Sequence, residues 1–331
     1  MSEKSSQNEC IHSKKDQVIG GVLGLAVADA VGVPAEFSSR ERLKANPVQT
    51  MEGYGTHNQP PGTWSDDSSM TFCLLESLCK GYDLDDLADR FVRWYRDAYW
   101  TPHGVVFDIG IATSKAISKL MQGVPAVQAG GTSESDNGNG SLMRILPLAY
   151  FLESVEDEQK RLEIIHQVSA VTHGHLRSQI GCAIYVEMAL QLLKGLPPHL
   201  AYVNMQENVL KYYSNGGQEV ADELENYDRV LKGKIFRAPQ STIRSSGYVV
   251  HTLEAALWCF LQNLTYKGTV LDAVNLGEDT DTVAAVAGGL AGIYYGLQSI
   301  PAEWVEGLAR KTDILLLCER FYNAVYQEEK K

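Results

Sequence analysis

An acidic pair flanked by hydroxyl groups is the first feature of the sequence that points to chemistry. The segment "GTWSDDSSM" places Ser65, Asp66 and Asp67 directly before an apolar run with helical spacing. Serine and aspartate are preferred helix N-caps, so capping alone is one interpretation. A cap requires only one acid, however, and a second adjacent carboxylate adds repulsion with little structural return. A helix cap and a functional site therefore both remain open for this pair.

A second acidic segment, "GEDTDTVAAVAGGLAG", lies far down the chain. Glu278, Asp279 and Asp281 concentrate negative charge before a helix that is too apolar to leave the protein interior. A buried charge without compensation is very costly, so a cation is expected nearby. The ions Mg²⁺ and Mn²⁺ prefer carboxylate, hydroxyl and water oxygens as ligands. This segment therefore favours a site for hard metal ions.

Charge counting favours two divalent ions over one. The four aspartates of the two segments carry four negative charges, which two divalent cations neutralise and one leaves half uncompensated. The predicted oxygen ligands are Ser65, Asp66, Asp67, Asp279, Asp281 and Thr282. The calcium-loop pattern D-x-D-x-D-G is absent from both segments. The sequence alone does not bring the two segments together.

A glycine-rich loop, "DNGNGSLMRILPL", has the composition of a phosphate-binding turn. Gly138, Asn139, Gly140 and Ser141 allow backbone N–H groups to converge at the start of a helix. Neither the Walker pattern nor the dinucleotide fingerprint is matched, so a plain glycine-rich turn is the alternative.

Two ring-bearing positions are further candidates for ligand contacts. His173 and His175 in "THGH" are two residues apart, which on a helix points them to different faces and makes them a poor pair of metal ligands. His173 at a helix start could donate to a phosphate or ribose. Tyr248 in "GYVVHTLEAALW" could stack on a purine, although a core tyrosine is the ordinary interpretation.

The first apolar segment ends in a turn that carries two acids. In "GVLGLAVADAVGVPAEF", Asp29 and Glu36 lie on either side of the turn. Both are interpretable as caps or surface acids. Glu36 could alternatively reach the metal site and orient a water molecule.

Helices are the elements that position these residues. The chain of 331 residues has 44% hydrophobic residues, 21% charged residues and a mean hydropathy of -0.17, values typical of a soluble globular protein. Convincing strand alternation is absent. Apolar residues recur at helical spacing in residues 16–32, 68–80, 84–98, 105–122, 141–153, 158–171, 175–194, 200–231, 248–263, 267–275, 280–297 and 302–326. The sequence therefore predicts a single compact all-α domain over 16–331, after a disordered polar tail over 1–15.

The charge and the cysteines exclude several classes of partner and compartment. A net charge of -12 repels nucleic acid backbones and anionic membranes, so no nucleic acid or membrane partner is expected. Six scattered cysteines without a C-x-x-C pair indicate reduced core thiols of a cytoplasmic protein. The apolar runs near residue 20 and over 282–302 imitate membrane signals, but buried helices rich in small residues explain both.

Six segments, taken in order, give the sequence a family resemblance. The segments are "GVLGLAVADAVGVPAEF", "GTWSDDSSM", "GNGSLMRILPL", "THGH", "GYVVHTLEAALW" and "GEDTDTVAAVAGGLAG". Together they resemble the ADP-ribosylglycohydrolase family, and they span nearly everything from residue 16 to about 297. The resemblance implies a single all-α domain with a binuclear Mg²⁺ or Mn²⁺ centre.

The resemblance also assigns roles to residues. The metal ligands fall on the six positions selected above. The loop from Gly138 to Ser141, with Met143, is expected to hold the diphosphate of ADP-ribose. His173 is expected to contact ADP-ribose, and Tyr248 to lie by the adenine or its ribose. Three positions depart from the family pattern: Ser65 and Ser68 replace the usual threonines, and Glu278 replaces a commoner glycine.

The expected reaction is hydrolysis of the bond between the anomeric carbon of ADP-ribose and a protein side chain, with ADP-ribose as product. Its transition state resembles an oxocarbenium ion. Asp66 or Asp67, and after them Glu36, are the candidate bases that take the proton from the attacking water. Arginine-linked ADP-ribose is the expected substrate. Serine-linked ADP-ribose and small ADP-ribose conjugates are the alternative substrates. A metal-assisted acid phosphatase or nucleotide hydrolase and a non-catalytic ADP-ribose-binding or crystallin-like protein are the alternative functions.

Overall fold

The computed structural model describes residues 12–327, and the all-α prediction is confirmed. Between these residues the backbone forms helices joined by loops, with two isolated β-bridges and no strand. The first eight helices are α1 (Lys14–Gly32), α2 (Arg40–Ala45), α3 (Asp66–Leu78), α4 (Leu84–Asp97), α5 (Ile111–Met121), α6 (Ala126–Ala129), α7 (Pro147–Phe151) and α8 (Glu158–Ala170). The next are α9 (Leu176–Leu193), α10 (Pro198–Tyr212), α11 (Gly217–Glu225), α12 (Asp228–Leu231), α13 (Val249–Gln262), α14 (Tyr266–Asn275), α15 (Thr280–Tyr295), α16 (Ala302–Gly307) and α17 (Lys311–Tyr326).

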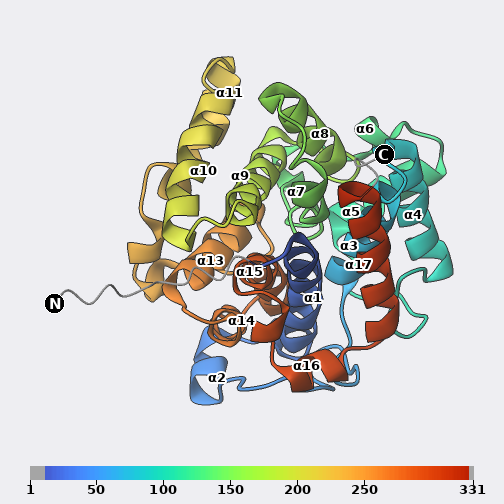
Figure 1. Cartoon of the computed structure of the whole chain (residues 1–331), viewed down its shortest axis with the longest axis vertical. Coiled ribbons are helices and arrows are strands. Elements are labelled where there is room, and N and C mark those ends of the chain that lie inside the picture. Colours follow the sequence, from blue (N-terminus) through green and yellow to red (C-terminus); the bar gives the residue numbers. More distant parts are fainter. Residues whose placement is uncertain (1–11, 328–331) are drawn as a thin grey trace.

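Helices α1 and α15 lie side by side at the centre of the molecule (Figure 1). Glycines allow the close approach: a Cβ atom on Gly24 would lie 2.6 Å from the Gly288 carbonyl oxygen, and one on Gly32 would lie 2.3 Å from the Asp281 Cα. The two contacts run in opposite sequence directions, so the helices are antiparallel. The C-terminal end of α1 is thereby placed against the N-terminal end of α15, which carries the second acidic segment.

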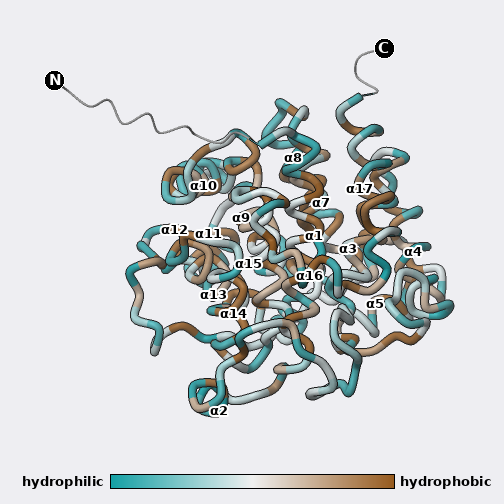
Figure 2. Tube along the Cα trace, turned by 60° about the horizontal axis from the view of Figure 1, so that its bottom comes forward, coloured by the Kyte–Doolittle hydropathy of each residue, from teal (hydrophilic) through white to brown (hydrophobic). Residues whose placement is uncertain are grey.

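Both apolar runs that imitate membrane signals lie in this central pair. Residues Lys14–Ala35 are long and apolar enough to cross a membrane, but 89% of their most apolar window is buried inside the protein. The first part of 282–302 belongs to α15, whose residues up to Ile293 are all buried. Apolar residues are concentrated along inner helices such as α7, whereas most residues of the outer helix α2 are hydrophilic (Figure 2).

Four of the predicted helices are shorter or broken, and the one over 141–153 is reduced to α7. The predicted helix over 105–122 begins only at Ile111, because Asp108 adopts a left-handed backbone with φ of 58°. The predicted helix over 200–231 is split into α10, α11 and α12, with Gly217 at φ of 73° between the first two. The predicted helix over 302–326 is interrupted at Arg310, where φ is 51°.

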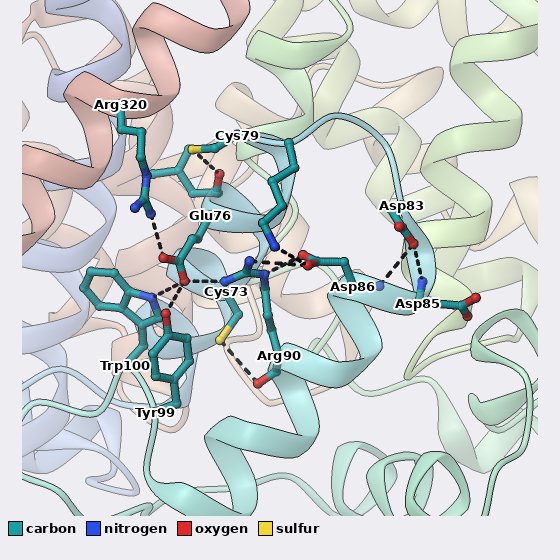
Figure 3. Close-up of polar contacts among 12 residues, drawn as sticks. Cys73, Glu76, Cys79, Asp83, Asp85, Asp86, Arg90, Tyr99, Trp100 and Arg320 are labelled. Atoms are coloured by element: carbon teal, nitrogen blue, oxygen red, sulfur yellow. Dashed lines mark hydrogen bonds and ion pairs between the residues drawn. The ribbon is translucent and has the colours of Figure 1, made fainter.

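A polar cluster anchors the outer part of α3 to its neighbours (Figure 3). The Glu76 carboxylate accepts hydrogen bonds from Arg90 of α4, from Tyr99 and from Trp100, the last at 3.0 Å. Arg320 of α17 donates to its other oxygen at 2.6 Å. The contacts fix the direction of α3, whose N-terminal end carries the first acidic segment.

The predicted N-terminal tail falls mostly outside the described residues. Residues 1–11 and 328–331 are not part of the description. Helix α1 begins at Lys14, with the Ser13 side chain accepting from the Asp16 N–H at 3.1 Å. The disorder of residues 1–11 and the domain limits stay predictions.

Candidate active site

The two acidic segments meet at the N-terminal ends of two helices. Ser65 is the N-cap of α3, and its hydroxyl accepts from the Asp67 N–H at 3.2 Å. Asp279 is the N-cap residue of α15, and Thr282 lies in its first turn. The Thr282 hydroxyl donates to Asp67 Oδ1 at 3.3 Å, which joins the segments directly. The antiparallel packing of α1 and α15 thus supplies the proximity that the sequence leaves open.

Asp29 of α1 holds the start of α3 in place. One carboxylate oxygen accepts from the Ser65 N–H at 3.0 Å, and the other accepts from the Ser68 N–H at 3.1 Å and the Ser68 hydroxyl at 2.5 Å. Asp29 is fully buried, so it is neither a surface acid nor a cap of its own helix. It satisfies N-terminal N–H groups of a neighbouring helix instead.

Buried and half-buried carboxylates form two overlapping clusters. In the first, one oxygen each of Asp29, Asp67 and Asp281 lies within 4.8 Å of the others, and in the second the same holds for Glu36, Asp279 and Asp281. Oδ2 of Asp67 and Oδ2 of Asp281 are buried without a hydrogen-bond partner. Burying a carboxylate oxygen without a partner costs free energy, and such oxygens are suitable ligands for hard divalent cations. The residues present therefore fit the predicted metal centre.

Burial raises the pKa of each carboxyl group in these clusters. The pKa of Asp29 rises to about 7 through burial, opposed by its hydrogen bonds to Ser68 and Ser65. Burial also raises the pKa values of Asp67 and Asp281 well above the ordinary range, and repulsion from neighbouring carboxylates raises them further. The metal-free cluster is thus under electrostatic stress, which bound cations would relieve.

We expect the metal-free protein to lose stability as the pH rises from about 4 to about 8. Burial raises the pKa values of both Asp29 and Glu36 to about 7, against an unfolded value near 4. The folded state therefore binds more protons in this interval, and the stability present below pH 4 is lost as the pH rises through 7. Urea unfolding in EDTA at several pH values in this range measures the slope of the free energy of unfolding against pH.

Added Mg²⁺ should reverse the sign of this dependence, because metal binding requires deprotonated carboxylates. A stability in EDTA that stays flat or rises between pH 4 and pH 8 would contradict the arrangement of buried, mutually repelling acids.

A cavity of about 380 Å³ opens beside the acidic clusters. It is lined by nine of the residues selected from the sequence, namely Glu36, Asp66, Gly138, Asn139, Gly140, Met143, His173, Asp279 and Thr282. Ser65, Asp67 and Asp281 are buried and do not line it. Most of the candidate site residues are thus brought to one place, from segments that are far apart in the sequence.

The glycine-rich loop is not the start of a helix. Helix α7 begins only at Pro147, so the expectation of a helix starting at Ser141 is wrong. The Asn139 N–H donates to the Gly247 carbonyl at 3.0 Å, and the Asn139 amide donates to Asp279 Oδ2 at 2.8 Å. The loop is therefore attached to the acidic clusters by a side chain. Gly138 and Gly140 face the cavity without side chains of their own.

His173 presents one ring nitrogen to this loop. Its Nδ1 lies 2.8 Å from the Thr172 hydroxyl oxygen, which accepts a hydrogen bond from Arg144 Nη2 at 2.8 Å. The hydroxyl proton is then free to go to Nδ1, so Nε2 carries the ring proton and faces Gly138. Burial, with a contribution from Arg144, lowers the pKa of His173 to about 3. A neutral donor is therefore directed at the cavity.

Arg144 places an uncompensated positive charge behind His173. The side chain is fully buried, and no carboxylate pairs with it among residues 12–327. Burial lowers the pKa of Arg144 only to about 10, so the guanidinium stays charged at neutral pH. Its Nε and Nη1 atoms have no hydrogen-bond partner. This charge favours an anionic ligand at the glycine-rich end of the cavity.

Two predicted ligand contacts lie outside the cavity lining. The Ser141 side chain is fully buried and accepts from Ser169 Oγ at 3.0 Å, so its hydroxyl points into the interior. Tyr248 is half-buried beside the cavity, where its hydroxyl accepts from Arg177 Nη1 at 3.1 Å. An isolated bridge pairs Tyr248 with Gly138, which keeps the ring next to the loop.

Replacing Gly140 by Ala is expected to weaken ADP-ribose binding by about 10-fold or more. The added Cβ would lie 2.8 Å from both His173 Cε1 and Thr113 Oγ1, so one of these side chains has to move. Gly138→Ala is the matched control, because its Cβ meets nothing closer than His173 Nε2 at 3.5 Å. Calorimetric titration with ADP-ribose compares the two. Equal affinities would show that the ring position does not matter for binding.

Two residues of the cavity region, His57 and Asp108, are not among those selected from the sequence. His57 hydrogen-bonds through Nε2 to Glu36, and the same nitrogen lies 3.9 Å from Asp108 Oδ1. Asp108 lines the cavity. Glu36 is buried, so its interpretation as a surface acid is wrong. Burial raises its pKa to about 7, opposed mainly by the hydrogen bond from His57.

Glu278 occupies a backbone conformation that favours glycine. Its φ is 63°, in the left-handed region, which costs a residue with a side chain about 1–2 kcal/mol. Its carbonyl oxygen accepts from the Phe37 N–H at 2.7 Å, and its side chain is exposed. The extra charge therefore lies outside the acidic clusters, although its backbone borders them.

Comparisons with known proteins agree with this geometry. The family model described as ADP-ribosylglycohydrolase matches residues 11–331. An ADP-ribosylarginine hydrolase of Pseudomonas putida (strain GB-1) is 35% identical over 94% of this chain and 79% of its own length. An ADP-ribosyl-[dinitrogen reductase] glycohydrolase of Rhodospirillum rubrum is 28% identical over 91% of this chain and 93% of its own length.

A solved structure titled as an ADP-ribosylglycohydrolase-related protein complex superposes with a TM-score of 0.78 and 33% identity. It covers 94% of this chain and 98% of the solved one. The match of the family model over nearly the whole chain, together with these relatives, shows that the chain belongs to the ADP-ribosylglycohydrolase family.

Proposed function

We propose that this protein releases ADP-ribose from arginine side chains with the help of two Mg²⁺ or Mn²⁺ ions. Hydrolysis of the glycosidic bond of ADP-ribose on modified proteins follows from the family. The linkage, the number of ions and their identity are the proposed parts. The observation that carries the linkage is the pair of carboxylates, Glu36 and Asp108, that lines one side of the cavity.

An arginine leaving group suits these acids. A guanidinium is a planar cation, and carboxylates bind it with charge-assisted hydrogen bonds. His57 is the one basic side chain in an ion pair with Glu36 or Asp108 among the described residues. A serine oxygen carries no charge, so the same acids would gain nothing from it. The relative from Pseudomonas putida that is named for ADP-ribosylarginine supports the same linkage.

The metal ligands are proposed to be Ser65, Asp66, Asp67, Asp279, Asp281 and Thr282. The orphaned oxygens of Asp67 and Asp281 fit this role. When bound, the ions supply a Lewis acid that lowers the pKa of a water molecule and holds ribose hydroxyls. The carboxylates around the cavity favour the positive charge that develops on the sugar in the transition state.

The base is proposed to be a cavity-lining carboxylate. Asp67 does not line the cavity, whereas Asp66 and Glu36 do. Glu36 hydrogen-bonds to His57, which orients its carboxylate, and its pKa of about 7, raised chiefly by burial, suits proton transfer near neutral pH. We therefore place Glu36 before Asp66 as the group that accepts the proton of the attacking water.

A reducing compartment such as the cytoplasm is the proposed location of the protein, because it fits the free cysteines among the described residues.

The test is hydrolysis of two matched peptides that carry ADP-ribose on arginine or on serine. The protein is incubated with each peptide in Mg²⁺, in Mn²⁺ and in EDTA, and the released nucleotide is identified by chromatography. Metal-dependent release of intact ADP-ribose from the arginine peptide is the expected result. Release from the serine peptide alone would move the substrate, and release of phosphate would indicate a phosphatase. Tight binding of ADP-ribose without release from either peptide would indicate a binding protein.

A further inference from the structure

Two exposed apolar side chains stand at the edge of the catalytic cavity. Phe37 and Ile111 both line it, yet Phe37 is 69% exposed and Ile111 is 77% exposed. Asp108, which lines the same cavity, lies three residues before the first residue of α5. We call Phe37 and Ile111 the apolar lip. Large apolar side chains that remain exposed beside a binding site mark contact surfaces more often than do scattered ones.

The backbone holds Phe37 outward at a conformational cost. Its φ is 61°, a left-handed value that is a genuine outlier for a bulky residue. The Phe37 N–H donates to the Glu278 carbonyl at 2.7 Å, and the ring centroid lies 6.1 Å from that of His57. Folding would favour glycine or asparagine here and gains little from an exposed ring. Strain that is retained for little packing benefit is typical of functional positions.

Ile111 is likewise not required by the packing of its helix. It is the first residue of α5, and the buried residues of that helix are Thr113, Ala116 and Ile117. Helical spacing places these three on the inward face. The Ile111 side chain faces away from that core and toward the cavity opening.

We propose that the apolar lip docks the polypeptide that carries the modified arginine, and that apolar residues flanking this arginine contact Phe37 and Ile111. The proposal rests on the proposed function. The cavity has a volume of about 380 Å³, which suits a small-molecule group, and a folded polypeptide does not fit within it. The modified protein must therefore lie across the opening, where the arginine meets Glu36 and Asp108 and the neighbouring residues meet the lip. Charged residues on either side of the modified arginine would gain no favourable contact with the apolar lip.

The prediction is a preference of the enzyme for protein context. Phe37→Ser and Ile111→Ser are each expected to raise the KM for an arginine-ADP-ribosylated peptide with apolar flanks by about 10-fold, the effect of losing one buried apolar contact. Because both side chains also line the cavity, the kinetics on free ADP-ribosylarginine, which has no flanks, measure their effect on the site itself. The KM for the flanked peptide should rise about 10-fold more than the KM for free ADP-ribosylarginine in both variants.

Two further variants serve as controls. Leu264→Ser removes a side chain that is 89% exposed but lies outside the cavity lining, so it should leave both substrates unaffected. Phe37→Gly removes the ring and also relieves the left-handed backbone strain, so it should not impair folding. A rise in the KM for the flanked peptide that occurs in both Phe37→Gly and Phe37→Ser is therefore not caused by misfolding. Unchanged peptide kinetics in the lip variants, or an equal loss on free ADP-ribosylarginine, would overturn the docking role.

The experiment also separates this proposal from the proposed function. If the wild-type protein cleaves both arginine substrates and the lip variants behave like wild type, the proposed function stands and the proposed docking role of the lip fails. A wild-type protein that cleaves neither substrate overturns both. If only serine-linked substrates are cleaved, the arginine assignment fails, and the same comparison of flanked and free serine conjugates decides the role of the lip.

Discussion

Asp281→Asn is expected to lower metal-dependent release of ADP-ribose by about 1,000-fold or more, the scale of losing a preorganised electrostatic group. Asp281 is the residue shared by both carboxylate clusters, and its Oδ2 atom is buried without a partner. Asparagine keeps the shape and the acceptor that binds the Thr282 N–H at 2.9 Å. It removes the negative charge that a divalent cation requires.

The same substitution is expected to stabilise the protein in EDTA. Burial and repulsion from Glu36, Asp108 and other acids raise the pKa of Asp281, so the charged group destabilises the metal-free fold at neutral pH. Thermal unfolding in EDTA and in Mg²⁺ measures both effects. The melting temperature of the variant should be higher than that of wild type in EDTA, and Mg²⁺ should raise it by less. A structural role alone would lower both melting temperatures.

Glu278→Gln is the matched control for this variant. It removes a charge from the same acidic segment, but Glu278 is exposed and its side chain does not line the cavity. Activity and metal response should stay near wild type. Loss of activity in the control would mean that the general negative charge of the region, rather than the buried carboxylates, supports catalysis.

Helical periodicity predicted most elements because packing and pattern agree there. It failed where a single residue with positive φ ends or interrupts a helix. Asp108, Gly217 and Arg310 each adopt positive φ, and none of these turns interrupts the apolar pattern strongly enough to be recognised. Charge counting selected the aspartates of both acidic segments, but their proximity depends on the glycine contacts between α1 and α15, which no local pattern encodes.

The residues that sequence reasoning missed are defined by their surroundings. Asp29 was interpreted as a cap or surface acid, but its buried role could have been predicted, because an acid inside a long uncharged apolar run has to be buried and therefore needs partners. His57 and Asp108 were not selected: His57 is one residue of a long loop rich in Gly, Asn and Pro, and Asp108 falls inside the predicted helix over 105–122. Their importance appears only when the loops converge on Glu36.

Glu36→Gln is expected to lower kcat by about 100-fold to 10,000-fold, the usual contribution of a general base. The affinity for ADP-ribose should stay close to wild type, because glutamine keeps the size of the side chain. The stabilisation by Mg²⁺ should fall by less than in Asp281→Asn, because Glu36 belongs to one of the two carboxylate clusters and Asp281 to both. Burial raises the pKa of Glu36 to about 7 in the metal-free protein, and nearby cations would lower it. The wild-type rate should therefore rise with pH along an acid limb below pH 7, and this limb should be absent in the variant.

His57→Gln tests whether the histidine positions the base. Glutamine retains a donor toward Glu36 but cannot carry the charge of a protonated imidazole, and the hydrogen bond and charge of His57 hold the pKa of Glu36 below what burial alone would give. The acid limb should shift to higher pH with a smaller loss of kcat than in Glu36→Gln. If Glu36→Gln keeps its kcat while Asp66→Asn loses activity but still responds to Mg²⁺, the base is Asp66. The Glu36–His57 pair would then only shape the cavity, and the acid limb would remain in both of its variants.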